Sequence, residues 1–101
     1  MIEVKNDEVI YKTGNVLCEE EVYYKDADYF KDGYMYSDYE IYCVVSEPER
    51  KIYVIDFKVL KSIYRKGEEK IINHYAQYSD VYLVPLGFIK QNGGLIDIIE
   101  Y

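Results

Sequence analysis

The sequence predicts a single α+β domain over residues 1–101, with a mixed β-sheet of about five to six strands and one main helix over residues ~60–79. Half of the residues are hydrophobic, which is enough to build a core in a chain of this length. Segments rich in Tyr, Ile and Val recur along the chain and are typical of strands. One stretch instead carries apolar residues three or four positions apart, which is typical of a helix.

The first third of the chain is expected to be mostly extended. Residues 2–12 have the composition of extended backbone, and residues 13–15 that of a turn. Residues 16–24 fit either a strand or a short helix, because their hydrophobic period does not separate the two. The polar residues 25–33 are expected to form a loop.

A hairpin is the clearest element of the middle third. Residues 38–45 and 51–59 are rich in β-branched and aromatic residues. The five residues 46–50 between them include a proline and suit a hairpin loop.

A loop of five residues also predicts which hairpin side chains lie opposite one another. Val45 then faces Lys51, and the acidic and basic residues at the far end of the hairpin pair as Glu40 with Asp56 and Asp38 with Lys58. Three carboxylates and one ammonium group would share one face. A slip of one residue would turn Asp38 and Glu40 to the other face.

The last third is predicted to hold the helix and two short strands. Within residues 60–79, Ile71, Ile72, Tyr75 and either Tyr78 or Ser79 recur at the spacing of a buried helix face. Residues 81–84 form an apolar strand that Pro85 ends or pushes to an edge, and residues 95–99 a final strand after a turn at residues 91–94.

Charge is divided unevenly between the two halves of the chain. The net charge is −7, and residues 1–50 contribute −8 while residues 51–101 contribute +1. Such a balance repels nucleic acid at long range, and an acidic half suits a basic partner or simply keeps the domain in solution. The basic residues of the second half bunch as Lys58, Lys61, Arg65, Lys66 and Lys70.

Several classes of protein are not expected. No run of residues approaches the ~20 apolar residues of a membrane span, and the first eight residues do not resemble a signal peptide. We therefore expect a cytoplasmic protein with no membrane partner. Cys18 and Cys43 form no C-x-x-C pair and are expected to be buried thiols.

The fourteen tyrosines permit two interpretations. Tyrosine favours strands, so the chain, which has no tryptophan, can use it to build its sheet. A cluster such as Tyr34, Tyr36, Tyr39 and Tyr42 can also form a face for a partner.

The acidic end of the predicted hairpin has the chemistry of a metal-dependent nuclease. Asp38, Asp56 and Glu40 would supply the carboxylate oxygens that suit Mg²⁺ or Mn²⁺. A bound metal activates water and polarises phosphate, while Lys58 would stabilise the charge that develops at the scissile phosphate. The basic residues Lys61, Arg65, Lys66 and Lys70 would hold the nucleic-acid backbone.

Four short segments carry a resemblance to a known family. They are Tyr53-Val54-Ile55-Asp56-Phe57-Lys58, His74-Tyr75-Ala76-Gln77-Tyr78-Ser79-Asp80, Val81-Tyr82-Leu83-Val84-Pro85 and Gly94-Leu95-Ile96. Together they resemble the PD-(D/E)xK nuclease superfamily, most closely its small MmcB-like branch, over residues 38–99. The resemblance implies a restriction-endonuclease-like core, with Asp38 as the first acid and Asp56 and Lys58 as the (D/E)-x-K. Whether such a site is active stays open, so the chain is predicted to be either a small phosphodiesterase or a scaffold derived from one.

An alternative function is a non-enzymatic inhibitor, of the anti-CRISPR or anti-defence type made by phages or of the bacterial immunity type. Its acidic first half would occupy a basic nucleic-acid-binding groove of a partner. The residues expected to do so are Glu19, Glu20, Glu21, Asp26, Asp28 and Asp32. A third possibility is a homo-oligomer joined through an exposed strand edge.

Overall fold

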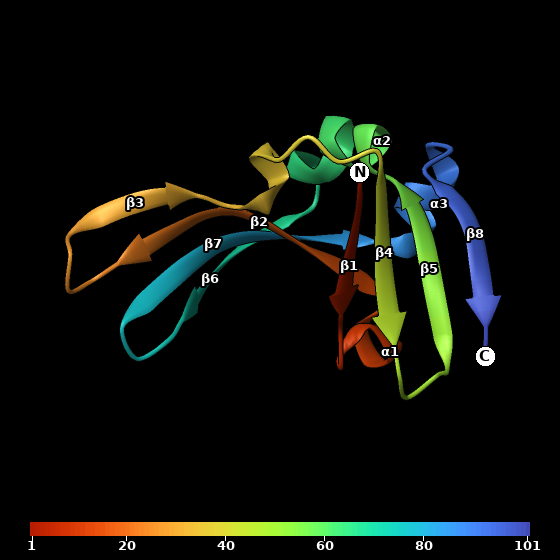
Figure 1. The fold of residues 1–101 in the computed structure, drawn as a ribbon, viewed down its shortest axis with the longest axis horizontal. Helices are drawn as coiled ribbons and strands as arrows, with labels where there is room; N and C mark the ends of the chain where they lie inside the picture. The colour runs from red at the N-terminus through yellow and green to blue at the C-terminus, as the bar shows by residue number, and fades with distance from the viewer.

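Two four-stranded sheets make up the protein, which a computed structural model describes over all residues 1–101. Sheet A has the strand order β1-β4-β5-β8 and sheet B the order β3-β2-β7-β6. Only β1 and β4 pair in parallel, and every other pair is antiparallel. Figure 1 shows that the strands of sheet A run steeply across those of sheet B, so that the two sheets enclose the core between them.

The strands of sheet A are β1 (Ile2–Asn6), β4 (Ile41–Ser46), β5 (Lys51–Asp56) and β8 (Leu95–Glu100). Those of sheet B are β2 (Asn15–Tyr24), β3 (Tyr29–Asp32), β6 (Glu68–Asn73) and β7 (Gln77–Pro85). The helices are α1 (Ile10–Thr13), α2 (Phe57–Ile63) and α3 (Leu86–Gln91), with 3₁₀ turns η1 (Tyr34–Tyr36) and η2 (Tyr64–Lys66). None of these helices has the length and apolar character needed to cross a membrane.

The core lies between one face of sheet A and the half of sheet B nearest to it. Tyr42 and Val44 of β4 and Ile55 of β5 point into it, because successive residues of a strand point to opposite faces. The buried cluster consists of Ile10, Val16, Cys18, Met35, Tyr42, Val44, Tyr53, Ile55, Phe57, Leu60, Ile63, Tyr64, Val84 and Ile89.

The other face of sheet A is covered by no element of the chain. We call it the outer face, and its apolar residues come from all four strands: Val4, Ile41, Cys43, Val45, Ile52, Val54 and Ile99. Cys43 is half-buried there, whereas Cys18 is fully buried in the core as expected.

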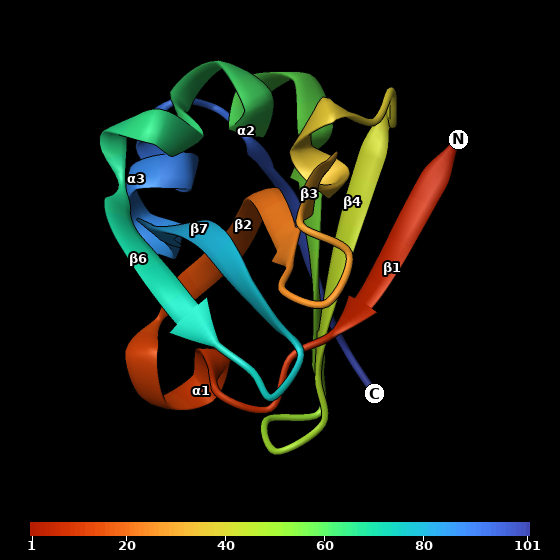
Figure 2. The same ribbon diagram turned by 90° about the vertical axis from the view of Figure 1, so that its left-hand side faces the viewer.

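The distal parts of two hairpins project from the body as an arm, residues 20–32 and 68–80. The β2–β3 hairpin and the β6–β7 hairpin lie side by side through the β2–β7 pairing. Figure 1 shows the arm extending away from sheet A, and Figure 2 views it from its tip. The molecule is elongated as a result, measuring 41 × 27 × 25 Å.

The expected single sheet around one main helix, with a restriction-endonuclease-like core, is wrong. The protein is a small mixed α+β fold, but it has eight strands in two sheets and three short helices. The segment 25–33, expected to be a loop, contains β3, and residues 86–91 form a helix that the sequence did not indicate. The ambiguous segment 16–24 belongs to β2, the longest strand.

The predicted helix over residues 60–79 ends early, at Ile63, and is followed by a 3₁₀ turn and two strands. Gly67 explains the change of structure, since a Cβ atom there would lie 2.5 Å from the carbonyl oxygen of Leu83 on β7. This close approach brings the chain alongside β7, where β6 completes the sheet. Beyond it, Ser79 and Val81 are buried with the two-residue period of a strand.

Candidate binding surface

Asp56 caps a helix. Its Oδ1 accepts hydrogen bonds from the backbone N–H groups of Lys58, at 3.0 Å, and Val59, at 3.3 Å. This is the usual role of an aspartate at the residue preceding the first turn of a helix. Lys58 therefore lies in the first turn of α2 and does not follow Asp56 along the face of a strand.

The hairpin register differs by one residue from the expected one. Ser46 pairs with Lys51 and Ile41 with Asp56, because only the four residues 47–50 form the loop. Glu40 and Asp38 precede β4, so neither pairing predicted for them with Asp56 or Lys58 is formed. The exposed carboxylate of Glu40 instead lies 3.7 Å from the N-terminal ammonium group.

These residues do not fit a magnesium or manganese ion. One carboxylate oxygen of Asp56 is committed to the helix cap, and Asp38 and Glu40 are exposed residues outside the β4–β5 ladder. No group of three or more His, Cys, Asp or Glu side chains in the protein is arranged to hold a metal ion.

The predicted nucleic-acid-binding residues mostly contact their own chain. Lys61 donates a hydrogen bond to the carbonyl oxygen of Ser37 at 3.1 Å, and Lys70 lies 3.4 Å from Glu68 on the same strand. Arg65 is paired with Glu20, and Lys66 is exposed at the end of η2. The four side chains come from α2, η2 and β6.

Glu20 is the centre of a polar cluster at the root of the arm. A β-bulge between Glu19 and Glu21 leaves Glu20 without a cross-strand partner and turns it toward η1 and η2. Its Oε1 accepts hydrogen bonds from Tyr36 at 3.1 Å, Tyr64 at 3.0 Å and Arg65 Nε at 2.9 Å.

The protonation of Glu20 follows from this cluster. Partial burial raises the pKa of the Glu20 carboxyl, but the hydrogen bonds from Arg65, Tyr64 and Tyr36 outweigh it and hold that pKa below its ordinary value. Glu20 is thus ionised and committed within the protein, and it is not a free group for a partner.

Three carboxylates form a row across the arm. Glu21 of β2 lies directly opposite Asp32 of β3 on one side and Asp80 of β7 on the other. Like charges directly opposite each other in a sheet are destabilising. Burial, a hydrogen bond with Glu69 and the negative charges of Glu69, Glu20 and Glu21 raise the pKa of Asp80 to about 6.

Three aromatic rings form a second row beside the acidic one. Tyr23 lies opposite Phe30 and Tyr78, with ring centroids 4.8 Å and 4.9 Å from its own. Each ring is two residues from a carboxylate on its strand, so both rows point to the same side of the sheet. We call this surface the acidic–aromatic face, made of Glu21, Asp32 and Asp80 with Tyr23, Phe30 and Tyr78.

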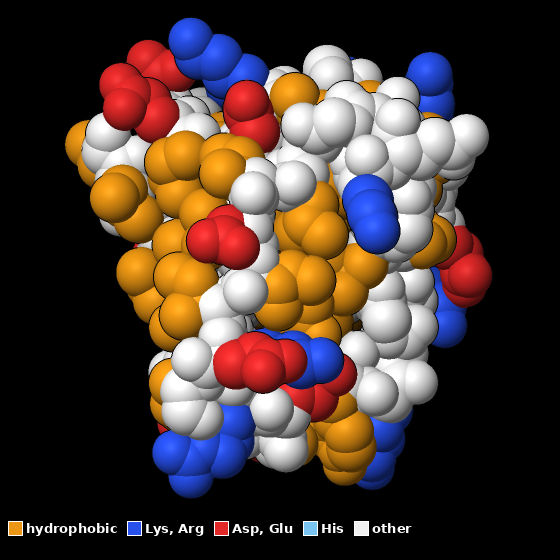
Figure 3. Space-filling view, turned by 90° about the vertical axis from the view of Figure 1, so that its right-hand side faces the viewer, with side chains coloured by type: hydrophobic (Ala, Val, Ile, Leu, Met, Phe, Trp, Pro, Cys, Tyr) orange, Lys and Arg blue, Asp and Glu red, His pale blue; other side chains and the backbone are white.

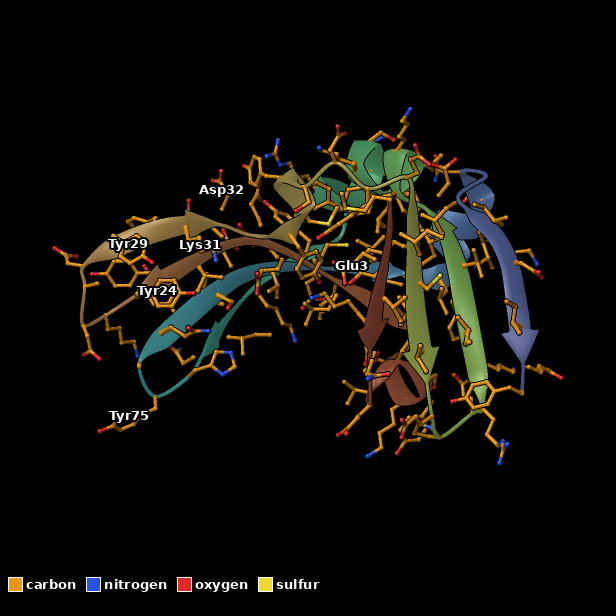
Figure 4. The ribbon with its side chains drawn as sticks, in the orientation of Figure 1. Glu3, Tyr24, Tyr29, Lys31, Asp32 and Tyr75 are labelled. Atoms are coloured by element: carbon orange, nitrogen blue, oxygen red, sulfur yellow. The ribbon has the colours of Figure 1, made fainter.

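Further aromatic residues lie on the opposite side of the arm and at its tip. Tyr24 and Tyr29 stack with ring centroids 5.1 Å apart. They lie on the side of the arm opposite to Asp32 (Figure 4). Tyr75, in the turn between β6 and β7, is fully exposed and points away from the body (Figure 4). The end of the arm therefore presents aromatic side chains in several directions.

A cavity of about 450 Å³ lies between β1, β2 and β4, on the side of the body near the root of the arm. Tyr42 and Val44 form its buried wall, and the acidic residues Asp7, Glu8 and Glu19 also line it. The ammonium group of Lys5, another lining residue, lies 5.2 Å from the ring centroid of Tyr34. The chain therefore already holds one of its own cations at this cavity.

The six acidic residues expected to bind a partner are distributed over several places. Glu21 and Asp32 belong to the acidic–aromatic face, and Asp26 and Asp28 lie in the exposed turn between β2 and β3. Glu20 is committed to its cluster with Arg65, and Glu19 lines the cavity.

Sequence reasoning missed Tyr23, Phe30, Tyr78 and Asp80. It placed Tyr78 on a helix, and it placed Phe30 in a loop. The spacing of these residues gave no specific signal, because an acid and an aromatic residue also stand two positions apart elsewhere in the chain, as in Tyr24-Lys25-Asp26 and Tyr36-Ser37-Asp38.

Comparison with family models, with curated proteins and with solved structures finds no match to the chain.

Proposed function

We propose that this chain is a non-enzymatic binding module whose acidic–aromatic face docks on a basic surface of a protein partner. The observation that carries the proposal is the paired arrangement of three carboxylates and three aromatic rings on adjacent strands. Aromatic side chains supply much of the energy of protein interfaces, and complementary charge selects the partner and speeds association.

The acidic row is better suited to a bound state than to the free protein. Glu21, Asp32 and Asp80 face one another across the sheet, and none of them forms an ion pair with a basic side chain of the protein. Lysine or arginine side chains from a partner would relieve this repulsion, which favours the complex. The aromatic row beside it would cover the aliphatic stems of the same side chains.

A nucleic acid is a poorer candidate than a basic protein. The net charge of −7 repels phosphate, and Lys61, Arg65 and Lys70 contact groups of their own chain. A protein groove that normally holds nucleic acid presents the required cations. Occupation of such a groove would make the chain a competitive inhibitor of its partner.

Binding can be tested with an arginine-rich peptide as the basic probe, titrated by calorimetry at two salt concentrations. We expect binding that weakens as salt rises, and Asp32→Lys to weaken it about tenfold or more. Glu100→Lys is the matched control, since it makes the same change at an exposed strand residue of sheet A, far from the arm. Equal loss of affinity in both variants would show that only the net charge matters, and would contradict the proposal.

The aromatic row requires a separate test. Phe30 is 57% exposed, so Phe30→Ala removes contact area without opening the core. We expect this variant to bind the probe several-fold more weakly while its salt dependence stays that of the wild type, because no charge is lost. If Phe30→Ala binds the probe as tightly as the wild type does, the aromatic row takes no part in binding, and that half of the proposal is wrong.

A further inference from the structure

The outer face of sheet A lacks any cover within the chain, although its strands have the composition of covered ones. Val4, Cys43 and Val54 form one apolar row across β1, β4 and β5. Val45, Ile52 and Ile99 form a second row across β4, β5 and β8. Figure 3 views the molecule from the end that sheet A forms. Hydrophobic side chains gather over the left and middle of this view, with a few acidic side chains among them.

The sequence of the two central strands, β4 and β5, also indicates that the outer face is covered in the functional protein. In β4 the residues Ile41-Tyr42-Cys43-Val44-Val45 are apolar on both faces, and β5 repeats this in Ile52-Tyr53-Val54-Ile55. Near-continuous apolar runs are typical of strands that are buried on both faces, whereas a strand with one wet face alternates with polar residues.

We propose that a second copy of this chain covers the outer face, so that the two sheets pack face to face in a symmetric dimer. Two sheets bury such faces by packing about 10 Å apart, as in a β-sandwich. The inference is independent of the proposed binding function, because the arm lies at the other end of the elongated molecule (Figure 1).

The chemistry of the outer face favours a second copy over other occupants. The two apolar rows contain no lysine or arginine, so they offer nothing to nucleic acid or to an anionic lipid surface. Asp97, which continues the first row on β8, is the acidic residue opposite Val54, so a basic partner would find one carboxylate beside a wide aliphatic area. An identical aliphatic face is the complement that such a surface needs.

The size of the outer face is sufficient for a weak dimer. Four strands spaced ~4.8 Å apart and about five paired residues rising ~3.3 Å each give roughly 300–400 Å² of flat face per copy. Side chains protrude from the sheet, so the accessible area exceeds the flat area. A dimer therefore buries on the order of 1,000 Å² in total, near the lower limit for a specific interface. A dissociation constant on the order of micromolar is therefore expected.

Sedimentation equilibrium over a concentration series tests the dimer directly. We expect the mass to rise from 12.0 kDa toward twice that value as concentration increases. Cys43 supplies a second readout, because its half-buried thiol lies in the first apolar row, whereas Cys18 is buried in the core. We expect a thiol reagent to react with Cys43 several-fold more slowly at high protein concentration than at low concentration.

Two variants locate the interface. Val4 on β1 is 56% exposed and Ile99 on β8 is 45% exposed, so lysine at either position is compatible with folding. A face-to-face dimer is weakened at least tenfold by both Val4→Lys and Ile99→Lys, whereas pairing through one strand edge responds to only one of them. Ile71→Lys on the arm, where the isoleucine is 54% exposed, is the matched control and leaves the dimer intact.

The opposite results would overturn the inference. A wild-type protein that stays at 12.0 kDa up to about millimolar concentration, or a Cys43 thiol whose reactivity does not depend on concentration, excludes the dimer. Loss of association in only one of the two lysine variants assigns the contact to a strand edge. Equal loss in Ile71→Lys assigns it to the arm.

Discussion

Glu20 and Arg65 form an ion pair that joins the arm to the body. The guanidinium Nε of Arg65 donates to Glu20 Oε1 at 2.9 Å, and the hydroxyl groups of Tyr36 and Tyr64 donate to the same oxygen. The sequence suggested Arg65 as a contact for nucleic acid and Glu20 as a contact for a basic partner. Each instead neutralises the other, and together they fix the root of the arm against η1 and η2.

Loss of the Glu20 charge should destabilise the protein. Glu20→Gln removes the ion pair and leaves the hydroxyl groups of Tyr36 and Tyr64 with a weaker acceptor, so we expect a loss of about 1–2 kcal/mol in the free energy of unfolding. Urea unfolding followed by circular dichroism measures it. Glu19→Gln on the same strand is the control, since the Glu19 carboxylate forms no ion pair, and its unfolding curve should stay close to that of the wild type. Equal losses would argue against the role of the cluster.

Stability should depend on pH through Asp80. The pKa of Asp80 is raised to about 6 in the folded protein from an ordinary value of 3.8, so between these values the folded chain binds more protons than the unfolded chain. The contribution of Asp80 to stability is therefore present in full below about pH 4 and is lost as pH rises through about 6. Asp80→Asn removes this dependence and should be more stable than the wild type at pH 7 by about 1 kcal/mol.

Unfolding free energies of both proteins between pH 4 and 7.5 check this prediction. The difference between the two curves reports Asp80 together with its interaction with Glu69, because all other carboxyl groups are shared. Curves that run parallel over this range would show that the pKa of Asp80 is not raised.

Two substitutions at Asp56 separate a helix cap from a catalytic carboxylate. Asparagine caps helices about as well as aspartate, so Asp56→Asn should unfold like the wild type, while Asp56→Ala should lose about 1 kcal/mol. If Asp56 were instead a metal ligand of a nuclease, both variants would lose Mg²⁺-dependent cleavage. Assays on DNA and RNA with Mg²⁺ and Mn²⁺ therefore test the nuclease prediction, which fails if the wild-type protein cuts neither nucleic acid.

Gly33 should tolerate no larger residue. A Cβ atom at this position would lie 2.3 Å from the carbonyl oxygen of Glu19, which is backbone and cannot move aside. We expect Gly33→Ala to cost about 2–3 kcal/mol in the free energy of unfolding. Gly87→Ala in α3 is the control, because a Cβ atom there meets nothing within 4 Å and alanine favours the helix. Thermal melts of the two variants should shift in opposite directions.

The β4–β5 hairpin was predictable from sequence, but its register was not. Tyr, Ile and Val identified the two strands, but residues 38–40 precede β4 and residues 57–59, expected in the second strand, begin α2. The register depends on the loop, where the backbone N–H of Arg50 bonds to the carbonyl oxygen of Glu47 at 3.0 Å and Arg50 adopts a left-handed φ of 53°. A non-glycine residue seldom adopts that conformation, so the composition of the loop did not reveal a four-residue connection.

The arm was not predictable because its strands are defined by contacts distant in sequence. Ile71, Ile72, Tyr75 and Tyr78 fit the period of a helix, and local preference alone does not decide between helix and hairpin. The pairing of β7 with β2, some sixty residues earlier, selects the strand. The acidic residues of the β2–β3 hairpin were identified from composition, but their alignment with Asp80 follows only from this long-range pairing.

The tight contact at Gly33 has a consequence for how the arm meets another molecule. The chain leaves β3 pressed against the backbone of Glu19 and Glu20, so the end of the β2–β3 hairpin nearest the body has a fixed position on β2. A hairpin fixed at its base loses less conformational entropy on binding than a free loop of the same length, which favours a partner whose surface matches its shape. The protein's choice of target would then depend on shape as well as on charge.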